Sequence, residues 1–264
     1  MSNGKVLAGI DAGHVNTKAV LMRGPEVLGY AISATGFDVV AASLTALGKV
    51  LDQTGVSALD LTGIITTGIF REMVKDPALD VVLTVPEYMA DATGALFLNK
   101  NSRTVIDIGG NVHKAIHYDE SGGLLDVIQN DKCADGLGIF YTNMARALGL
   151  SEQELSDLAL KSSRDVRVAI QCALGAESEA IDLLCQGMDI TDVANAVSRF
   201  LSERVAAMCT YLPLTKEIVV AGGLAKSEAI VKHLSALIKR DVSVADHPEY
   251  VGAVGAVMSY GGGR

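Results

Sequence analysis

A pattern of an apolar strand, an aspartate, a glycine turn and a second strand occurs twice in this chain. "VLAGIDAG" carries Asp11 and Gly13 and precedes "TKAVLMR", and "RTVIDIGG" carries Asp107 before Gly109 and Gly110 and precedes "HKAIHYD". A third strand follows each pair, and helical patterns follow the strands. The repeat predicts two similar α/β halves that face each other across a cleft, where small ligands usually bind. A single doubly wound sheet is the alternative, but it does not explain the duplicated hairpins.

Apolar spacing and turn residues predict the remaining elements. A glycine-ended helix is expected at residues 38–55, and Ser151 with Glu154 forms a capping box that starts another helix. Further helices are expected at 138–150, 176–188 and 190–212, a strand–Gly–Gly–helix unit at 217–238, and a closing strand and helix at 242–261. We expect one lobe at 1–100, a second at 101–245, and a C-terminal helix at 246–264 that returns to the first.

Composition narrows the class of protein. A formal charge of −9 argues against a general nucleic-acid binder, which would be basic. We expect no membrane association, because no apolar run reaches the length of a membrane span and Asp11 interrupts the apolar start. A cytoplasmic location follows, in which structural disulfides are rare. The four cysteines form no CxxC pair, so they are expected to be thiols or metal ligands.

The glycine turns are candidate phosphate-binding loops. Gly13 in the first turn and Gly109 with Gly110 in the second would let backbone N–H groups approach phosphate oxygens. Asp11 is a candidate ligand of hydrated Mg²⁺, and Asp107 would orient water or the metal. "AGGLAKS" offers a third turn, at Gly222 and Gly223, for close approach of an adenosine face. A lone Asp-x-Gly turn is more often only a turn, so only the three turns together indicate a nucleotide site.

These three motifs, "GIDAG", "DIGG" and "VVAGGLA", occur in the order of the actin-like ATPase superfamily, which the chain resembles. The resemblance implies an actin-like ATPase fold, in which two RNase-H-like lobes close on ATP or ADP with Mg²⁺. It implies catalytic roles for Asp11 and Asp107. The cofactor-binding residues that it implies are Gly13, His14, Asn16, Thr17, Lys18, Gly109, Gly110, Asn111, Gly136, Gly222 and Gly223.

A finer resemblance concerns two cysteines. "QNDKCADGLGIF" and "IQCALGAESEAI" resemble the paired motifs of the activator ATPases of 2-hydroxyacyl-CoA dehydratases and the ATP-binding subunits of benzoyl-CoA reductases. That branch implies that Cys133 and Cys172 bind a 4Fe–4S cluster shared across a two-fold axis, so that two chains supply four thiolates. Both cysteines are expected to precede helices, whose N-termini favour negative charge. Cys185 and Cys209 lie outside the motif and are expected to be buried core residues.

The same resemblance implies a function and partners. The chain would be an ATPase coupled to electron transfer, in a homodimer or a heterodimer with a related subunit. ATP-driven lobe motion would deliver low-potential electrons from the cluster to an acyl-CoA reductase or dehydratase component. A ferredoxin or flavodoxin would be the electron donor.

The chain departs from the family pattern at each loop. His14 stands where the first loop usually carries Ser or Thr, although Asn16 and Thr17 can replace that hydroxyl. The second loop has Asn111 for Gln and Val112 for Asp, and the loss of that carboxylate removes a contact to metal or water on which the rate of hydrolysis would depend.

Other positions stay open on the sequence alone. In the cysteine motif Asp135 replaces Ala and Ile139 replaces Arg. Lys18 and Lys114 either contact phosphate or are exposed strand lysines. Glu177 and Glu179 either touch nucleotide or cap a helix, and His113, His117 and His247 are expected to be structural or surface residues.

Two other classes remain open. A small-molecule kinase of the same fold, acting on a sugar or an acyl group, would need a catalytic carboxylate and no paired cysteines. A polymer-forming subunit would need a heterologous interface instead of a closed dimer. A brown, oxygen-sensitive preparation would favour the electron-transfer hypothesis over both.

Overall fold

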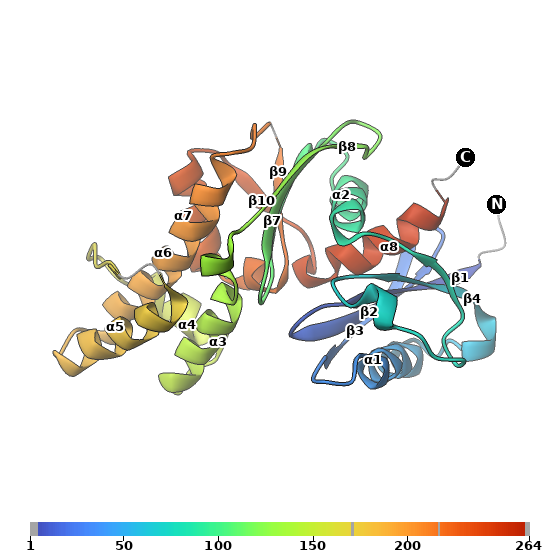
Figure 1. Ribbon diagram of the computed structural model, residues 1–264, viewed down its shortest axis with the longest axis horizontal. Helices are drawn as coiled ribbons and strands as arrows, with labels where there is room; N and C mark the ends of the chain where they lie inside the picture. Colours follow the sequence, from blue (N-terminus) through green and yellow to red (C-terminus); the bar gives the residue numbers. More distant parts are fainter. Residues whose placement is uncertain (1–4, 170–171, 216, 262–264) are drawn as a thin grey trace. The chain divides into compact units, whose positions relative to one another are not determined.

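The computed structural model describes residues 5–169, 172–215 and 217–261, and the chain divides into two compact units. The first unit comprises Met1–Ser102, Tyr118–Leu125 and Ala245–Arg264, and the second comprises Arg103–His117 and Asp126–Val244. Two five-stranded sheets are the main framework, and helices pack against them (Figure 1).

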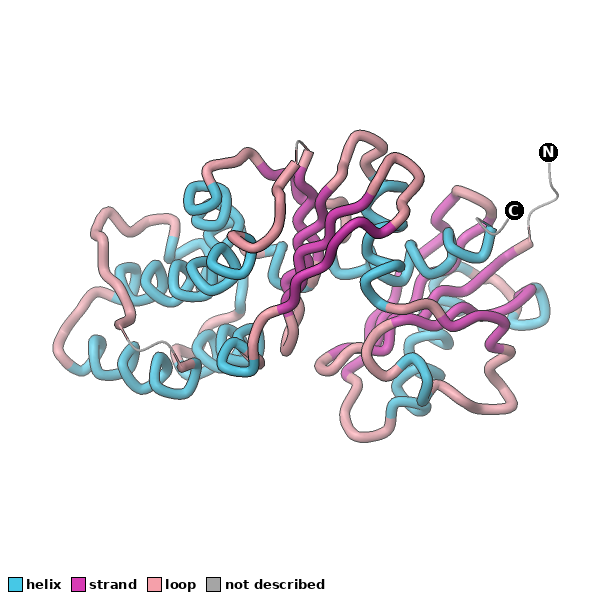
Figure 2. Tube along the Cα trace, turned by 45° about the horizontal axis from the view of Figure 1, so that its top comes forward, coloured by secondary structure: helices cyan, strands magenta, loops and turns pink. Residues whose placement is uncertain are grey.

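The first sheet has the strand order β3-β2-β1-β4-β5. Figure 2 shows the strands of both sheets in magenta. Strands β1, β2 and β3 are antiparallel neighbours, and β4 and β5 continue the sheet parallel to β1. The strands are β1 (Val6–Ala12), β2 (Asn16–Arg23), β3 (Glu26–Ala34), β4 (Leu61–Thr67) and β5 (Val81–Thr84).

Alternation along β1 gives each face of this sheet its own core. Ala8 and Ile10 belong to the apolar cluster shared with α1, while Leu7 belongs to the clusters shared with α8. Asp38 caps α1 by accepting a hydrogen bond from Ala41 N, and the helix ends at its C-cap residue Gly55, as the sequence predicts for its C-terminus. The helices are α1 (Val39–Thr54), α2 (Glu87–Leu98) and α8 (Val251–Gly261), with 3-10 turns η1 (Ala58–Asp60), η2 (Arg71–Met73) and η5 (Pro248–Tyr250).

Helices α2 and α8 lie side by side, although more than half the chain separates them in sequence (Figure 1). Glycines make the close approach possible. A Cβ at Gly255 would overlap the carbonyl oxygen of Ala90, and one at Gly94 would overlap that of Val251. This pairing fixes the C-terminal helix in the first unit.

The second sheet repeats the topology of the first, with the order β10-β9-β6-β7-β8. Strand β6 is antiparallel to β7 and parallel to β9, as β1 is to β2 and β4. The repeat predicted from the sequence is therefore present in the described structure. The strands are β6 (Thr104–Ile108), β7 (His113–Tyr118), β8 (Leu124–Gln129), β9 (Ile218–Ala221) and β10 (Val242–Val244).

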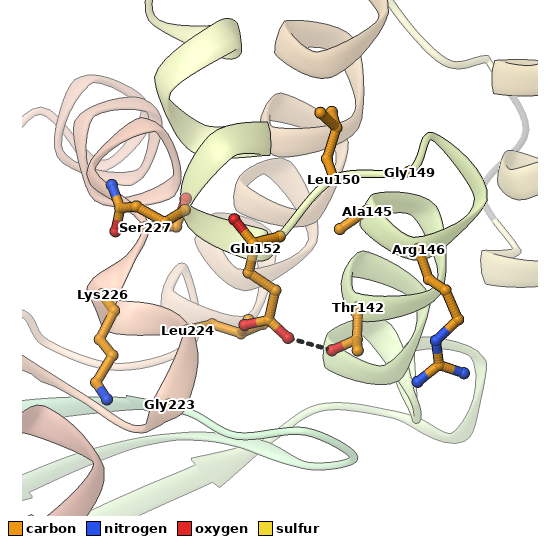
Figure 3. A pocket seen from close by; sticks show the side chains of 12 residues that line it. Thr142, Ala145, Arg146, Gly149, Leu150, Glu152, Gly223, Leu224, Lys226 and Ser227 are labelled. Atoms are coloured by element: carbon orange, nitrogen blue, oxygen red, sulfur yellow. Dashed lines mark hydrogen bonds between the residues drawn. The ribbon is translucent and has the colours of Figure 1, made fainter.

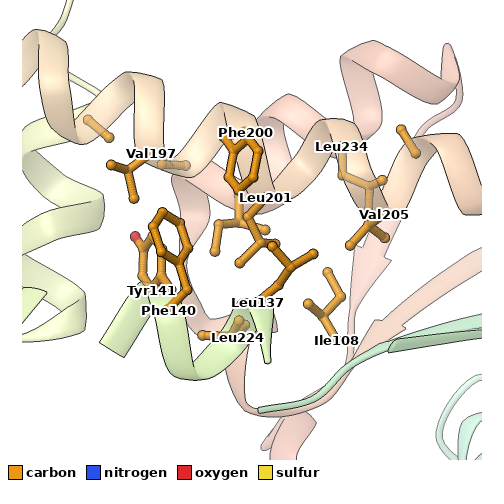
Figure 4. Close-up of a cluster of buried hydrophobic side chains, with 14 of the residues drawn as sticks. Ile108, Leu137, Phe140, Tyr141, Val197, Phe200, Leu201, Val205, Leu224 and Leu234 are labelled. Carbon is orange, nitrogen blue, oxygen red and sulfur yellow. The ribbon is translucent and has the colours of Figure 1, made fainter. Parts of the chain in front are cut away.

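One apolar core joins this sheet to the helices of the second unit (Figure 4). Phe140 of α3 meets Phe200 of α6 edge to face, with 5.5 Å between ring centroids. The helices are α3 (Leu137–Ala147), α4 (Glu152–Ala159), α5 (Ala173–Cys185), α6 (Ile190–Cys209) and α7 (Glu228–Ile238), with 3-10 turns η3 (Lys132–Ala134) and η4 (Gly223–Lys226).

Strand β8 is an edge of the second sheet and exposes apolar side chains. Leu125 is 59% exposed, and Leu124 and Val127 are also exposed. Asp126 lies between them and is exposed as well.

None of the helices in the described ranges combines the length and apolarity that crossing a bilayer requires.

Candidate functional site: two glycine loops, a cavity and a cysteine segment

The repeat places an aspartate opposite a lysine in each sheet. Asp11 pairs with Lys18 across β1 and β2, and their side chains approach to 2.9 Å. Asp107 pairs with Lys114 across β6 and β7 in the same way, at 3.0 Å. Each lysine therefore neutralises a largely buried carboxylate. The alternative that these are exposed strand lysines is wrong, because the Lys18 and Lys114 side chains are only 18% and 5% exposed.

Asp11 keeps one oxygen available. Its Oδ2 pairs with Lys18, while Oδ1 is buried and accepts no hydrogen bond within the described part of the chain. A buried, unsatisfied carboxylate oxygen is costly unless a ligand or a cation completes it. A hard cation such as Mg²⁺ fits this oxygen.

The first glycine loop (residues 13–17) is fixed from inside by two threonines. Thr35 Oγ1 donates to Gly13 O at 2.8 Å, so Thr17 Oγ1 must donate the 2.9 Å hydrogen bond to Thr35 Oγ1. Thr17 is fully buried, and its hydroxyl orients the loop. His14 is exposed and rests edge to face against Phe70. Cofactor contacts by these residues, and by the half-buried Asn16 and Lys18, stay predictions.

The second glycine loop (residues 109–112) lies against the start of α3. Gly110 O accepts from Ile139 N at 2.9 Å, and Asn111 O accepts from Gly136 N at 2.8 Å. Gly136 has a φ of 81°, which favours glycine. These bonds connect the loop directly to the chain that follows Cys133.

A cavity of about 620 Å³ lies within the second unit, between α3, the start of α4 and the third glycine turn (Figure 3). Gly223 borders it, and a Cβ there would meet open space. Gly222 differs, because its φ is 89° and a Cβ would lie 2.5 Å from Asp107 Oδ1. The two glycines therefore differ in their structural roles. Gly222 allows the turn to pack closely against Asp107, and Gly223 leaves the cavity open.

The cavity wall combines cations with hydrogen-bonding groups. Arg146 and Lys226 line it, and Thr142 Oγ1 donates to Glu152 Oε1 at 2.6 Å (Figure 3). Ser151 caps α4 through the predicted capping box and also lines the cavity. A cavity of this volume with a few placed polar groups suits a nucleoside-sized ligand.

The cysteine segment (residues 130–136) joins β8 to α3. Cys133 lies in the short turn η3, and its side chain is outside the described part of the structure. It is not adjacent to α3, which begins at Leu137. Cys172 is exposed and is the N-cap residue of α5. The expectation that a cysteine precedes a helix therefore holds directly for Cys172, and the predicted ligation by both residues stays a prediction.

The other cysteines differ from each other. Cys209 is 2% exposed, as expected of a core residue, and burial raises the pKa of its thiol to about 12. Cys185 was expected in the core, but it is the exposed last residue of α5. That expectation is wrong because the C-terminal end of α5 is exposed to solvent at this position.

Two polar residues, Asn130 and Glu179, have roles that their sequence patterns do not reveal. Asn130 bonds the backbone of His113, and Glu179 accepts from Ala169 N with both oxygens, at 2.9 and 3.0 Å. Glu179 therefore fixes the backbone at Ala169. His113 is 1% exposed, and neither ring nitrogen has a hydrogen-bond partner among the described residues. Only long-range contacts reveal these roles, so no local signal could have found them.

Comparison with known proteins gives a consistent result. The profile of the BadF/BadG/BcrA/BcrD ATPase family matches residues 8–259. The activator of lactoyl-CoA dehydratase from Anaerotignum propionicum is 31% identical over 251 residues, which cover 95% of this chain and 95% of that protein. One of the subunits of benzoyl-CoA reductase from Thauera aromatica is 29% identical over 219 residues, covering 81% of this chain and 76% of that protein.

Solved structures agree with the topology. The activator of the 2-hydroxyisocaproyl-CoA dehydratase from Clostridium difficile, with bound ADPNP, matches with a TM-score of 0.89 and 28% identity, covering 96% of this chain and 93% of that chain. A ROK family glucokinase from Streptomyces griseus shares only the fold, with a TM-score of 0.59 and 14% identity over 95% of this chain and 97% of that chain. The predicted actin-like ATPase fold is confirmed.

Proposed function

The chain belongs to the BadF/BadG/BcrA/BcrD ATPase family, and from that membership we propose that it is an ATP-dependent electron-transfer component. It would activate an acyl-CoA dehydratase or reductase. The observation that carries this proposal is the 31% identity to a dehydratase activator across 95% of both chains. The similarity to a component of benzoyl-CoA reductase supports the same role with a reductase partner.

The nucleotide would use residues of the second unit. The adenosine would enter the cavity beside Gly223, where Arg146 and Lys226 supply positive charge and Glu152 can accept hydrogen bonds from ribose hydroxyls. Backbone N–H groups at Gly109 and Gly110 would bind phosphate oxygens, because neither residue has a side chain in the way.

Asp11 and Asp107 would divide the catalytic work. The unsatisfied Oδ1 of Asp11 fits Mg²⁺, and Mg²⁺ when bound neutralises phosphate charge. Asp107 would orient the attacking water or a metal-bound water. Lys18 and Lys114 hold the two carboxylates in place through their ion pairs.

The thiolates of Cys133 and Cys172 would bind one edge of a 4Fe–4S cluster. The described cysteine fits this role, since Cys172 is exposed at the N-terminus of a 13-residue helix, where negative charge is favoured. A 4Fe–4S cluster supplies one-electron transfer when it is bound. The same two residues of a second subunit, identical or related, would complete the four thiolates. A ferredoxin or flavodoxin would reduce this dimer.

Anaerobic purification tests the proposal. Cys133→Ala and Cys172→Ala are expected to lose most of the bound iron and the absorbance at about 400 nm that clusters give. Cys185→Ala is the matched control and should keep both. ADP binding should survive in all three variants, because none of the described residues that line the cavity is a cysteine. Full iron occupancy in both variants, or iron-free wild type with sugar kinase activity, would contradict the proposal.

A further inference from the structure

The cysteine segment is connected to the second glycine loop by backbone hydrogen bonds at one end, and to His113, the residue after the loop, by one backbone and one side-chain hydrogen bond at the other end. The backbone bonds run from Gly136 N to Asn111 O and from Ile139 N to Gly110 O. The side chain is that of Asn130, the residue after β8. Together they connect one end of the turn that carries Cys133 to the loop expected to bind phosphate, and the other end to the residue that follows this loop.

Asn130 uses every hydrogen-bonding atom of its amide. Its Oδ1 accepts from His113 N at 2.6 Å, and its backbone N donates to His113 O at 3.2 Å. Its Nδ2 donates to Asp131 O and to Asp135 Oδ1, both at 2.9 Å. Exchanging the amide oxygen and nitrogen would break all three side-chain bonds, so this orientation is the one that the network requires.

Asp135 closes the far side of the turn. Its Oδ1 accepts from Asn130 and its Oδ2 lies 3.3 Å from Lys132 Nζ, while Asp131 accepts from Ala134 N. Asn130 therefore bonds to the residues on both sides of Lys132–Ala134. Because His113 is 1% exposed, little water is available to replace the Asn130–His113 bond if the loop moves.

We propose that Asn130 is a positioning residue that transmits nucleotide-induced changes in the second glycine loop to the segment carrying Cys133. Residues 111 to 113 are consecutive, so a rotation of the loop backbone carries the His113 amide with it. The Asn130 side chain then carries Asp131 and Asp135. This inference rests on the proposed function, because it assumes that the loop binds a nucleotide.

Hydrogen exchange of the full chain, with and without Mg²⁺ and the non-hydrolysable ATP analogue AMPPNP, tests it. In wild type, nucleotide is expected to slow exchange in residues 142–153, which border the cavity, and to slow it about five-fold in residues 131–136. Asn130→Ala is expected to keep the first effect, with affinity within about three-fold, and to reduce the second below about two-fold. A merely structural role would instead raise exchange equally with and without nucleotide.

Further variants separate the bond from Asn130 to Asp135 from the bond between Asn130 and His113. Asp135→Ala should lose the response of residues 131–136, Asp135→Asn should keep it by retaining an acceptor oxygen, and the Asn130→Ala/Asp135→Ala double variant should be no worse than either single one. Gln129→Ala, at the exposed neighbouring residue of β8, is the control and should behave as wild type. If Asn130→Ala does not fold, Asn130→Asp keeps the acceptor for His113 and removes both donors.

The outcomes distinguish the two proposals. A wild-type chain without nucleotide protection anywhere would overturn the proposed function. Protection of residues 142–153 without protection of residues 131–136 would overturn the role of Asn130 alone. An undiminished response of residues 131–136 in Asn130→Ala would overturn it as well.

Discussion

At the scale of the residue, His113 lies where its imidazole is kept neutral. Burial lowers the pKa of His113 from 6.5 to about 4, with Lys114 adding to the effect and Asp107 opposing it. The unfolded chain, whose imidazole has the ordinary pKa, therefore binds a proton below pH 6.5 that the folded chain does not. The folded state is therefore less stable below pH 6.5 than above it, and this loss of stability grows as the pH falls towards 4.

Replacement of His113 should therefore flatten part of the pH dependence of stability. His113 is expected to account for a fall of about 1.4 kcal/mol per pH unit below pH 6.5. Denaturant unfolding of wild type and His113→Leu at pH 7 and pH 5 measures this. The free energy of unfolding of His113→Leu relative to wild type should be higher at pH 5 than at pH 7. The same difference between the two proteins at both pH values would contradict the assigned burial effect.

Substitutions at the two glycines of the third turn should have different effects, one on stability and one on ADP binding. Gly222→Ala is expected to lower the free energy of unfolding by about 2–4 kcal/mol, because its φ is positive and its Cβ meets Asp107 and Ile108 O. Gly223→Val should keep stability within about 1 kcal/mol but raise the Kd for ADP about ten-fold by filling the cavity. Thermal unfolding measures the stability of each variant, and calorimetric titration measures its affinity for ADP. A stable Gly222→Ala, or a Gly223→Val that binds ADP like wild type, would contradict these roles.

At the scale of the element, the sequence was most informative where a strand was bounded by a charge and a glycine. Strands β1, β2, β6 and β7 were predictable because each half of the repeat marks them in the same way. Strand β5 and helix α2 were not, because β5 has four residues and α2 buries small residues and Asp91 instead of a stripe of large apolar ones. The partner of each repeat lysine was equally hidden, since cross-strand register decides it.

The same distinction between local signals and long-range contacts applies to the candidate site. Glycines at 13, 109, 222 and 223 were predictable because turn chemistry is local. Asn130 and Glu179 were not, because their bonds reach backbone groups 17 and 10 residues away. The cavity also escaped prediction, since it is formed by segments from two distant parts of the sequence.

The crossing of α2 and α8 should tolerate no side chain at its centre. Gly255→Ala is expected to cost more than about 3 kcal/mol, because its Cβ would overlap Ala90 O and the helices would have to separate. Gly261→Ala, in the last turn of α8 with open space around it, should be neutral or slightly stabilising. Equal melting temperatures for the two variants would refute the close approach.

At the scale of the whole molecule, each unit has its own hydrophobic core, which predicts separate losses of protection. Phe140→Ala in the second unit is expected to cost about 3–5 kcal/mol and to speed hydrogen exchange mainly in α3 and α6. Leu47→Ala, in the core of the first unit, should speed exchange mainly in α1 and β1. Identical exchange patterns for the two variants would show that the units unfold as one body.

The exposed edge of the second sheet has a consequence for handling the protein at high concentration. Strand β8 is an edge strand with three exposed aliphatic side chains, and such an edge can template intermolecular strand addition and amyloid-like growth. The carboxylate of Asp126 in the middle of that strand acts as a gatekeeper. Asp126→Val should therefore become turbid and bind thioflavin under conditions where wild type stays clear, and a clear solution would show that other features guard this edge.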